Sequence, residues 1–347
     1  MQQTNYNPVR LGLVGLNFGG GLANRQIFGQ ANEKFVKIVA VCDLDRAKAD
    51  KYAAEHGNLP AYYSLSDILA DEQVEAIMLM IPPAGRSAAV QQCLAANKHV
   101  LTTKPFDLDP ASAQAALEEA AKRKLTVHLN SPAPHPSDDL QQIRLWQKKF
   151  DLGNPVSAYW ETYAEYHEQA DGSWFDSFEK CPAAPIFRIG IYGINELVEL
   201  LGEPEKVELA TSRISTGRPT PDNAQLTIKF TNGAIGTVYA ALCIGDGQLY
   251  PSALTVHFEH GTIYKRQCRK LEERDFQTLE LRLTTVRDGK FYEEQVTLPA
   301  ANRSGGYQYD KFYEAVRNNL PDTPGTIKAI VSGVKALAMM AEKEKMQ

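Results

Sequence analysis

The sequence lacks the features that would bring it into a membrane or onto a nucleic acid. Its most apolar segment, AIMLMIPPAG (76–85), is interrupted by two prolines and is far shorter than the roughly 18 residues that a membrane span needs. A net charge of −5 offers no attraction to nucleic acid or to an anionic membrane. The segment MQQTNYNPVR contains no basic region followed by an apolar run, so we expect a cytoplasmic protein without a secretory signal.

Cysteine is scarce and follows no pattern. An odd, scattered set of cysteines is typical of reduced thiols in the cytosol. His167, His257 and His260 also lack acids or cysteines at ligand spacing, so the sequence predicts no metal site. The five cysteines, none in a CxxC pair, are Cys42, Cys93, Cys181, Cys243 and Cys268.

What is present is an ordinary composition at a length that suits two domains. The 347 residues are 44% hydrophobic and 23% charged, and a chain this long usually divides into more than one core. Strand-like and helix-like segments alternate up to Asn130, and a Pro-rich junction, SPAPHPSDD, follows. We predict a dinucleotide-binding domain in residues 1–130 and a substrate-binding and oligomerisation domain in residues 131–347.

The first of these domains alternates apolar strands with helical segments. Such alternation predicts a parallel sheet with right-handed crossovers, which is an α/β fold of the Rossmann type. Helical segments such as KADKYAAEHG lie between the strands. The expected strands are VRLGLVG, FVKIVAVCD, VEAIMLMIP, HVLTTKP and TVHLN.

A glycine-rich turn, GLNFGG, follows the first of these strands. At a strand-to-helix turn, backbone N–H groups and the helix dipole can hold a pyrophosphate. Asn17 replaces the middle glycine of the usual fingerprint; asparagine tolerates a left-handed backbone, but its side chain could crowd the phosphates. We predict that Gly15, Asn17, Phe18 and Gly20 contact a dinucleotide.

Asp43 closes the second strand and supports the same prediction. Its carboxylate can accept hydrogen bonds from the adenosine ribose hydroxyls and would repel a 2′-phosphate. A helix cap for the segment LDRAKAD is a compatible alternative role. NAD is therefore the expected cofactor, while Arg46 keeps NADP as an alternative because its guanidinium could pair with a phosphate.

Lys104 stands at the end of the apolar strand HVLTTKP. The carboxyl ends of parallel strands face the ligand crevice of an open sheet, and Pro105 restricts the backbone of the residue before it. The Lys104–Pro105 bond is a candidate for the cis form. Lys104 is therefore our first candidate for a catalytic residue.

Nearly the whole chain resembles the Gfo/Idh/MocA family, which includes glucose–fructose oxidoreductase and inositol dehydrogenase. The resemblance lies in VRLGLVGLNFGG, VAVCDLDRAKADKYAAEHG, EAIMLMIPP, NKHVLTTKPFDL and FRIGIYGIN, in this order. It implies a Rossmann domain, then an open and mostly antiparallel sheet that often builds a dimer or tetramer. It also implies C-terminal helices that pack back on the Rossmann half, and NAD(P)-dependent chemistry at a sugar or polyol hydroxyl.

Matching the family's motifs adds expected cofactor-binding residues. The Glu-Lys-Pro motif corresponds to Thr103-Lys104-Pro105, with threonine in place of glutamate, and implies that Lys104 lies near the nicotinamide and the reacting hydroxyl. The Thr-Pro-Asn loop corresponds to Ile81-Pro82-Pro83, and a histidine common after that loop corresponds to Arg86. The resemblance thus adds Ile81, Pro82, Arg86, Thr103, Lys104 and Pro105 to the expected cofactor site.

The family's Asp-x-Gly-x-His/Tyr-x-x-Asp/Asn helix corresponds to residues 188–195. Arg188, Tyr192 and Asn195 fall at i, i+4 and i+7 of an otherwise apolar segment, so an α-helix would place them on one side. Tyr192 is our second catalytic candidate. It would act as an acid/base, because adjacent positive charge makes its phenol more acidic. Lys104 is the alternative for that role, and Asn195 is a candidate for substrate binding.

Arg188 departs from the family, which has aspartate at this position. A guanidinium matches a carboxylate or phosphate, so one hypothesis makes Arg188 the anchor of an anionic substrate such as a sugar acid. The competing hypothesis is an internal salt bridge to Glu196, Asp176 or Glu179, which is the commoner fate of a buried arginine.

The second half of the chain is expected to be α+β, with a mainly antiparallel open sheet packed on one face against helices. Segments rich in Val, Ile, Thr and Tyr extend from residue 156 to 298, with FTNG and EHG as hairpin turns, and helical segments follow. His135 and Trp174 are further candidates for substrate contact. Their alternatives are a plain loop residue and a core tryptophan.

Together these features predict an NAD(P)-dependent oxidoreductase that moves a hydride between nicotinamide and a hydroxyl or carbonyl carbon of a sugar, polyol or sugar acid. Two alternatives stay open. One is a catalytically silent protein that binds NAD and a sugar as a regulator, and the other is a redox-neutral enzyme that returns the hydride within one turnover. The presence of both Lys104 and Tyr192 favours an enzyme.

Overall fold

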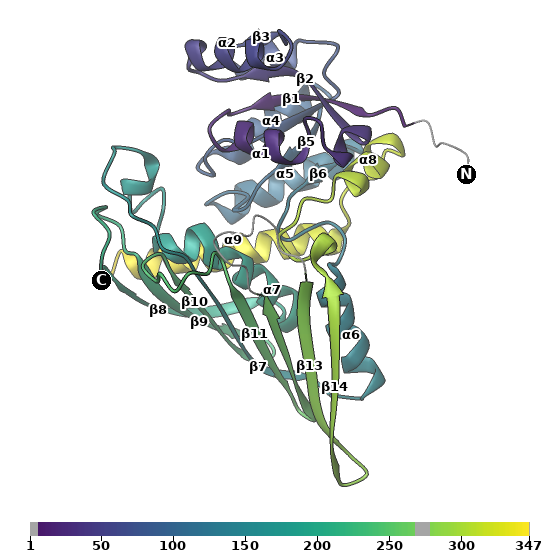
Figure 1. Cartoon of the computed structure of the whole chain (residues 1–347), viewed down its shortest axis with the longest axis vertical. Helices are drawn as coiled ribbons and strands as arrows, with labels where there is room; N and C mark the ends of the chain where they lie inside the picture. Colours follow the sequence, from purple (N-terminus) through teal and green to yellow (C-terminus); the bar gives the residue numbers. More distant parts are fainter. Residues whose placement is uncertain (1–5, 268–277, 347) are drawn as a thin grey trace. The chain divides into compact units, whose positions relative to one another are not determined.

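The structure, a computed structural model, describes residues 6–267 and 278–346 and divides into two compact units, each with its own sheet (Figure 1). The first unit contains the chain up to Asp107, Ala111–His135 and Tyr307–Lys328. The second contains Leu108–Pro110, Pro136–Gly306 and the chain from Ala329 onward. The expected division had a single boundary after residue 130, whereas the chain here returns to the first unit near its end.

Within the described residues, the first unit holds a six-stranded parallel sheet in the order β3-β2-β1-β4-β5-β6. This order is that of doubly wound dinucleotide-binding sheets, whose winding reverses between β1 and β4, and it confirms the expected fold. The short strand β3 was not expected, because its two residues are only half-buried and form no apolar run. The strands are β1 (Val9–Val14), β2 (Val36–Cys42), β3 (Ala61–Tyr62), β4 (Ala76–Leu79), β5 (His99–Thr102) and β6 (Val127–His128).

Helices flank this sheet, and two of them have an N-terminal cap made by a side chain. Asp45 caps one of them by accepting the backbone N–H of Lys48, and Ser64 caps the next by accepting that of Asp67. The helical elements are α1 (Phe18–Gln26), the 3₁₀ turn Ala31–Lys34, α2 (Arg46–Glu55), α3 (Leu65–Leu69), α4 (Arg86–Ala95), α5 (Pro110–Arg123) and α8 (Tyr309–Arg317).

The late segment joins the first unit through α8. Phe312 and Val316 belong to the buried core of this unit, and the guanidinium of Arg317 lies 2.8 Å from the carboxylate of Glu75. Apolar burial and this ion pair explain why residues so distant in sequence pack together. Most of the last helix, α9 (Pro324–Glu344), belongs to the second unit, where its buried residues Leu337 and Met340 lie in the core.

Among the residues that the structure describes, the second unit contains an eight-stranded sheet in the order β14-β13-β12-β11-β7-β10-β9-β8. One neighbouring pair, β7 with β10, is parallel and the others are antiparallel, which confirms the expected mostly antiparallel sheet and the hairpins at FTNG and EHG. The strands are β7 (Pro155–Tyr163), β8 (Pro204–Ser212), β9 (Asn223–Phe230), β10 (Ile235–Ala241), β11 (Ser252–Phe258), β12 (Gly261–Gln267), β13 (Thr278–Arg287) and β14 (Lys290–Pro299).

The helix α7 (Ile191–Leu201) is buried against this sheet. Gly193 lies against the indole of Trp160, where a Cβ would overlap the ring, so a glycine is needed for the helix to approach the strand. The helix ends as expected at Gly202, whose φ of 98° favours glycine. The other helical elements are α6 (Asp138–Lys149), the short turns Trp174–Asp176 and Ala300–Asn302, and a π-helical turn at Ile186–Gly190 directly before α7.

A buried ion triad joins α6, α7 and β12. The Nζ of Lys265 lies 2.7 Å from Oδ2 of Asp139 and 2.6 Å from Oε2 of Glu196. Glu196 was one of the expected partners of Arg188, and the structure instead pairs it with Lys265. In the described part of the chain, no helix combines the length and apolar composition that crossing a bilayer requires.

Candidate functional site

The glycine turn after β1 brings α1 close to the neighbouring strands. Gly15 has φ of 90°, and a Cβ there would lie 2.6 Å from the backbone oxygen of Met80. A Cβ on Gly19 would lie 2.9 Å from that of Met80. Both glycines are therefore needed for the turn and for close packing of helix on strand, as a dinucleotide-binding turn requires.

Of the residues between these glycines, Leu16 is buried, whereas Asn17 and Phe18 are exposed. Asn17 is exposed and has φ of −61° and ψ of −74°, which is right-handed backbone. The tolerance of asparagine for a left-handed backbone therefore does not explain its presence here. Phe18, at the first position of α1, is 52% exposed.

Asp43 connects the end of β2 to the glycine turn. Its Oδ2 accepts the backbone N–H of Leu16 at 2.9 Å and its Oδ1 accepts that of Asp45 at 3.0 Å. The cap of α2 is Asp45, so the helix-cap role considered for Asp43 belongs to its neighbour. A carboxylate can accept about four hydrogen bonds, which leaves Asp43 acceptor capacity beyond these two.

The basic residues beside Asp43 are partly engaged within the protein. The guanidinium of Arg46 lies over the ring of Tyr63, 4.6 Å from its centre. The Nζ of Lys48 lies 3.8 Å from Oδ1 of Asp43. Asp43 thus places a carboxylate at the end of β2. Arg46, which was considered as a partner for a phosphate, lies over an aromatic ring instead.

Lys104 follows β5, and its backbone is held by Asn130. The amide of Lys104 donates to Oδ1 of Asn130 at 3.1 Å, and the hydroxyl of Thr103 donates to the same oxygen at 3.3 Å. The Lys104–Pro105 bond is cis. Asn130 was not among the expected site residues, although its place two residues after β6, at the same edge of the sheet, was a signal that could have identified it.

Arg86 is buried beneath the same segment. It is 1% exposed, and its guanidinium donates to the carbonyl oxygens of Ile81, Thr103 and Pro105. Burial lowers the pKa of Arg86 to about 10. These contacts give Arg86 a structural function, because it ties the loop after β4, with its exposed Pro82, to the segment after β5. Cofactor binding by Arg86 therefore forms no part of our proposal.

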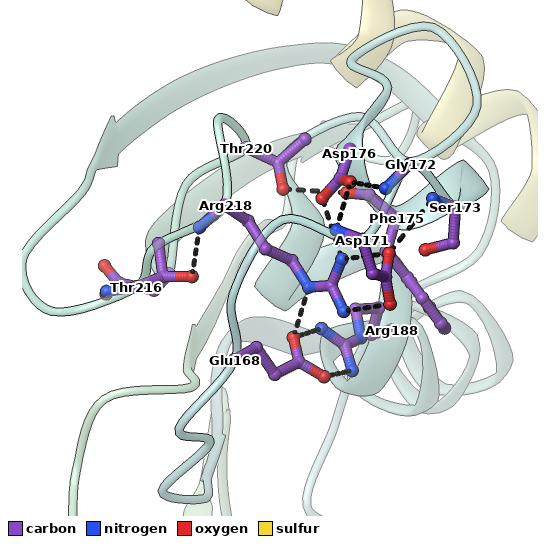
Figure 2. Close-up of polar contacts among 11 residues, drawn as sticks. Glu168, Asp171, Gly172, Ser173, Phe175, Asp176, Arg188, Thr216, Arg218 and Thr220 are labelled. Atoms are coloured by element: carbon purple, nitrogen blue, oxygen red, sulfur yellow. Dashed lines mark hydrogen bonds and ion pairs between the residues drawn. The ribbon is translucent and has the colours of Figure 1, made fainter.

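In the second unit, Arg188 forms a bidentate pair with Glu168, shown in Figure 2. Nη1 donates to Oε2 at 2.6 Å and Nη2 donates to Oε1 at 2.9 Å. The guanidinium also lies over the rings of Phe175 and Tyr166, at 4.3 and 4.8 Å from their centres. The hypothesis of an internal salt bridge was right in kind and wrong in partner, since Glu168 was not among the three acids considered.

Arg218 extends this pair into a network (Figure 2). Its Nε donates to Oε2 of Glu168 at 2.9 Å, and its Nη1 donates to Asp171 at 2.9 Å and to Asp176 at 2.7 Å. Burial acts to raise the pKa of Glu168, but the hydrogen bonds and charges of both arginines outweigh it and lower that pKa. No periodic pattern marks Glu168 or Arg218, because the two residues come from separate loops.

The structure does not place Arg188, Tyr192 and Asn195 around a common partner. Arg188 lies in the π-helical turn, whose hydrogen bonds span five residues, so the i, i+4 geometry of an α-helix does not apply to it. The ring of Tyr192 lies 2.8 Å from where a Cβ on Gly305 would be. Asn195 is 3% exposed and packs against Gly333 of α9.

The two remaining candidates lie in separate environments. His135 is exposed in the first unit, and its backbone N–H and carbonyl bond the side chain of Gln308. Trp174 is half-buried in the second unit, and its ring centre lies 4.0 Å from that of Phe175 with the two planes tilted by 31°. Within the described residues, no three His, Cys, Asp or Glu side chains gather as metal ligands would. Cys268 lies outside the described residues.

Two family models match the chain. The model described as "Oxidoreductase family, NAD-binding Rossmann fold" matches residues 9–131, and the "GFO/IDH/MocA C-terminal domain" matches residues 140–264. Together they extend from β1 into β12, which includes the whole first sheet and the second sheet as far as β12. Each match therefore falls on the unit whose fold it describes.

Similar proteins of known activity include dehydrogenases, and solved structures share the fold of this chain. Galactose 1-dehydrogenase from Pseudomonas fluorescens is 27% identical over 257 residues, 73% of this chain and 72% of that protein. Trans-1,2-dihydrobenzene-1,2-diol dehydrogenase from Sus scrofa is 26% identical over 217 residues, 58% of each protein, so the chain spans little more than half of that relative. Levoglucosan dehydrogenase in complex with NADH and L-sorbose has a TM-score of 0.72 at 17% identity, covering 97% of each chain, which shows a shared fold.

Proposed function

We propose that this chain, which belongs to the Gfo/Idh/MocA family of NAD(P)-dependent oxidoreductases, transfers a hydride between nicotinamide and a hydroxyl-bearing carbon of a sugar or polyol. The observation that carries the proposal is the placement of three features at one edge of the parallel sheet. The glycine turn follows β1, Asp43 follows β2 and Lys104 follows β5. In open parallel sheets, ligands bind outside this edge, where the winding reverses.

The residues of this edge fit a dinucleotide. Gly15 lets the turn approach the backbone of Met80 closely, as a dinucleotide-binding turn requires, and Asp43 retains acceptor capacity for ribose hydroxyls. In our proposal Gly15, Asn17, Phe18 and Gly20 hold the pyrophosphate, and the nicotinamide, when bound, supplies or accepts the hydride. NAD is favoured over NADP because the carboxylate of Asp43 repels a 2′-phosphate.

In our proposal, residues of the protein orient the substrate and transfer its proton. The ammonium of Lys104 donates a hydrogen bond to the reacting oxygen, and Asn130 fixes the backbone that carries it. The phenol of Tyr192 takes or returns the proton at that oxygen. Galactose 1-dehydrogenase among the relatives supports a carbohydrate as the substrate. Assembly into a dimer or tetramer is what the family resemblance implies.

The proposal is tested by following NADH formation with purified protein, NAD⁺ and a panel of sugars and polyols. We expect turnover with at least one compound, and Tyr192→Phe should lower kcat by about 10²–10⁴-fold because it removes the proton-transfer group. Tyr159→Phe is the matched control, since Tyr159 is 56% exposed on β7. NAD binding without any NADH would support the regulator alternative. Substrate conversion without net NADH would support the redox-neutral one.

Cofactor preference gives a second test. Asp43→Ser should lower the ratio of kcat/KM with NAD to that with NADP by about 10–100-fold, because charge-assisted hydrogen bonds to the ribose are lost and the repulsion of the 2′-phosphate disappears. Asp45→Asn, which keeps the cap of α2, should leave the ratio within about twofold. An unchanged ratio in Asp43→Ser would show that this carboxylate does not meet the cofactor.

A further inference from the structure

We infer that Arg86 and Asn130 are positioning residues, which act on the reaction by fixing the backbone on both sides of Lys104. This inference rests on the proposed function and deepens it, because it names the two side chains that direct the ammonium of Lys104. All three residues belong to the first unit. Neither Arg86 nor Asn130 needs to touch the cofactor or the substrate in this role.

Arg86 holds the carbonyl groups that flank Lys104. It is the first residue of α4, and its Nη1 donates to the carbonyl oxygen of Thr103 at 2.6 Å and to that of Pro105. Its Nη2 donates to the carbonyl oxygen of Ile81, in the loop after β4. One planar group therefore binds the residue before Lys104, the residue after it and the neighbouring loop.

Asn130 holds the amide of the same lysine from the other neighbouring strand. Its Oδ1 accepts the backbone N–H of Lys104 at 3.1 Å and the hydroxyl of Thr103 at 3.3 Å. Because β5 lies between β4 and β6 in the sheet, the segment after β5 is held from both sides. A catalytic group must be placed to within about 0.5 Å, which requires such support behind the residue that carries it.

The burial of Arg86 indicates more than a packing role. The side chain is 1% exposed, its partners among the described residues are backbone carbonyl groups, and its Nε has no hydrogen-bond partner there. Burial lowers its pKa to about 10, against the opposing effects of Tyr307 and Asp107, so Arg86 is a cation at neutral pH. A cation bonded to carbonyl groups rather than to a carboxylate is costly to bury. Proteins accept such costs mainly where function needs the geometry.

Lys98 offers a matched comparison at the other edge of the same sheet. It directly precedes β5, and its Nζ donates to the carbonyl oxygens of Asp71 and Val74 at 2.9 and 2.6 Å. Lys98 is therefore also a cation that ties backbone carbonyl groups together. It does so where the parallel strands begin, whereas ligands bind where they end, so the two ties separate a structural role from a catalytic one.

The first measurement is the turnover of Arg86→Met and Asn130→Leu, which replace each side chain by an apolar one of comparable length. In each variant kcat should fall by about 10–10²-fold, because a misplacement of about 1 Å costs that much. The KM for NAD should change by less than about threefold. Lys98→Met should leave kcat within about twofold. Undiminished kcat in the folded variants would overturn the inference.

Repeating each change in the Lys104→Ala background shows whether the residue acts through Lys104. The kcat of each double variant should then lie within about twofold of that of Lys104→Ala alone, because the group to be positioned is already missing. A merely structural role would lower kcat by the same factor in both backgrounds. Equal factors would therefore overturn the inference.

Hydrogen exchange followed by mass spectrometry tests the same anchors without turnover. Exchange of the amides in residues 103–106 should become at least about tenfold faster in Arg86→Met and in Asn130→Leu, and stay unchanged in Lys98→Met. Either anchor variant suffices if the other fails to fold, and unaltered exchange would overturn the inference.

These measurements also separate the two proposals. If the unmodified protein forms NADH with none of the sugars and polyols, the proposed function fails, and the role of Arg86 and Asn130 in hydride transfer fails with it. If NADH forms and the anchor variants match the unmodified protein, only the inference fails.

Discussion

Replacing Lys104 with alanine is expected to lower kcat by about 10²–10⁴-fold while NAD affinity changes only a few-fold. Lys104 supplies the positive charge and the hydrogen bond that the reacting oxygen needs in our proposal. The change removes this donor and leaves the backbone anchors in place: Asn130 still accepts the amide, and Arg86 still binds the carbonyls of Thr103 and Pro105. The measurement is steady-state turnover combined with a titration of NAD by calorimetry.

Two further variants make this result specific. Lys104→Arg keeps a positive charge with a different shape and should recover only part of the activity, because a planar guanidinium does not replace a compact ammonium. Lys37→Ala removes an exposed lysine of β2 in the same unit and should leave kcat unchanged. Undiminished turnover in Lys104→Ala would refute the mechanism.

Replacing Lys265 with alanine is expected to cost about 3–5 kcal/mol of the stability of the second unit. The lysine, Asp139 and Glu196 are almost completely buried, with side chains 3%, 2% and 11% exposed. Without the ammonium, two carboxylates are left in the interior without their partner, and neither can recover its solvation. The effect should therefore greatly exceed that of losing a surface ion pair.

The chain offers a convenient probe for this measurement. All three tryptophans, Trp146, Trp160 and Trp174, belong to the second unit, so tryptophan fluorescence in urea reports the unfolding of that unit. Lys206→Ala is the matched control, because its pair with Glu208 is 65% and 59% exposed and should contribute at most about 1 kcal/mol. A loss in Lys265→Ala no larger than that of the control would contradict the prediction.

Restoring charge balance should recover most of the lost stability. The triple change Lys265→Met, Asp139→Asn and Glu196→Gln removes all three buried charges at similar volume. Replacing a buried ionic set by neutral groups is often neutral or stabilising, so this variant should be more stable than Lys265→Ala. A triple variant as unstable as Lys265→Ala would show that packing, not charge, explains the loss.

The local features of the first unit were predictable from sequence because each depends on near neighbours. A parallel strand buried on both faces is a continuous apolar run, so β1, β2, β4 and β5 are visible as such. Because parallel topology brings strand ends to one edge, the residues that follow those runs are placed by the same pattern. Gly15, Asp43 and Lys104 were found in this way.

Features that depend on distant partners were not predictable. Asn130 and Glu168 are single polar residues whose importance arises from what folds against them: the backbone of Lys104 in one case and two arginines in the other. The spacing of Arg188, Tyr192 and Asn195 predicted one face of an α-helix. Arg188 instead lies in a π-helical turn, to which α-helical spacing does not apply.

What the sequence by itself determined is the order of the elements, the glycine turn, Asp43 and the lysine after β5, because strand periodicity and turn chemistry are local properties. Only the tertiary structure decided that α8 joins the first core, that Lys265 takes Glu196 and that Arg188 takes Glu168. The physical reason is that a buried charge must find an opposite charge. Several acids are available along the chain, and packing alone selects which of them lies within reach.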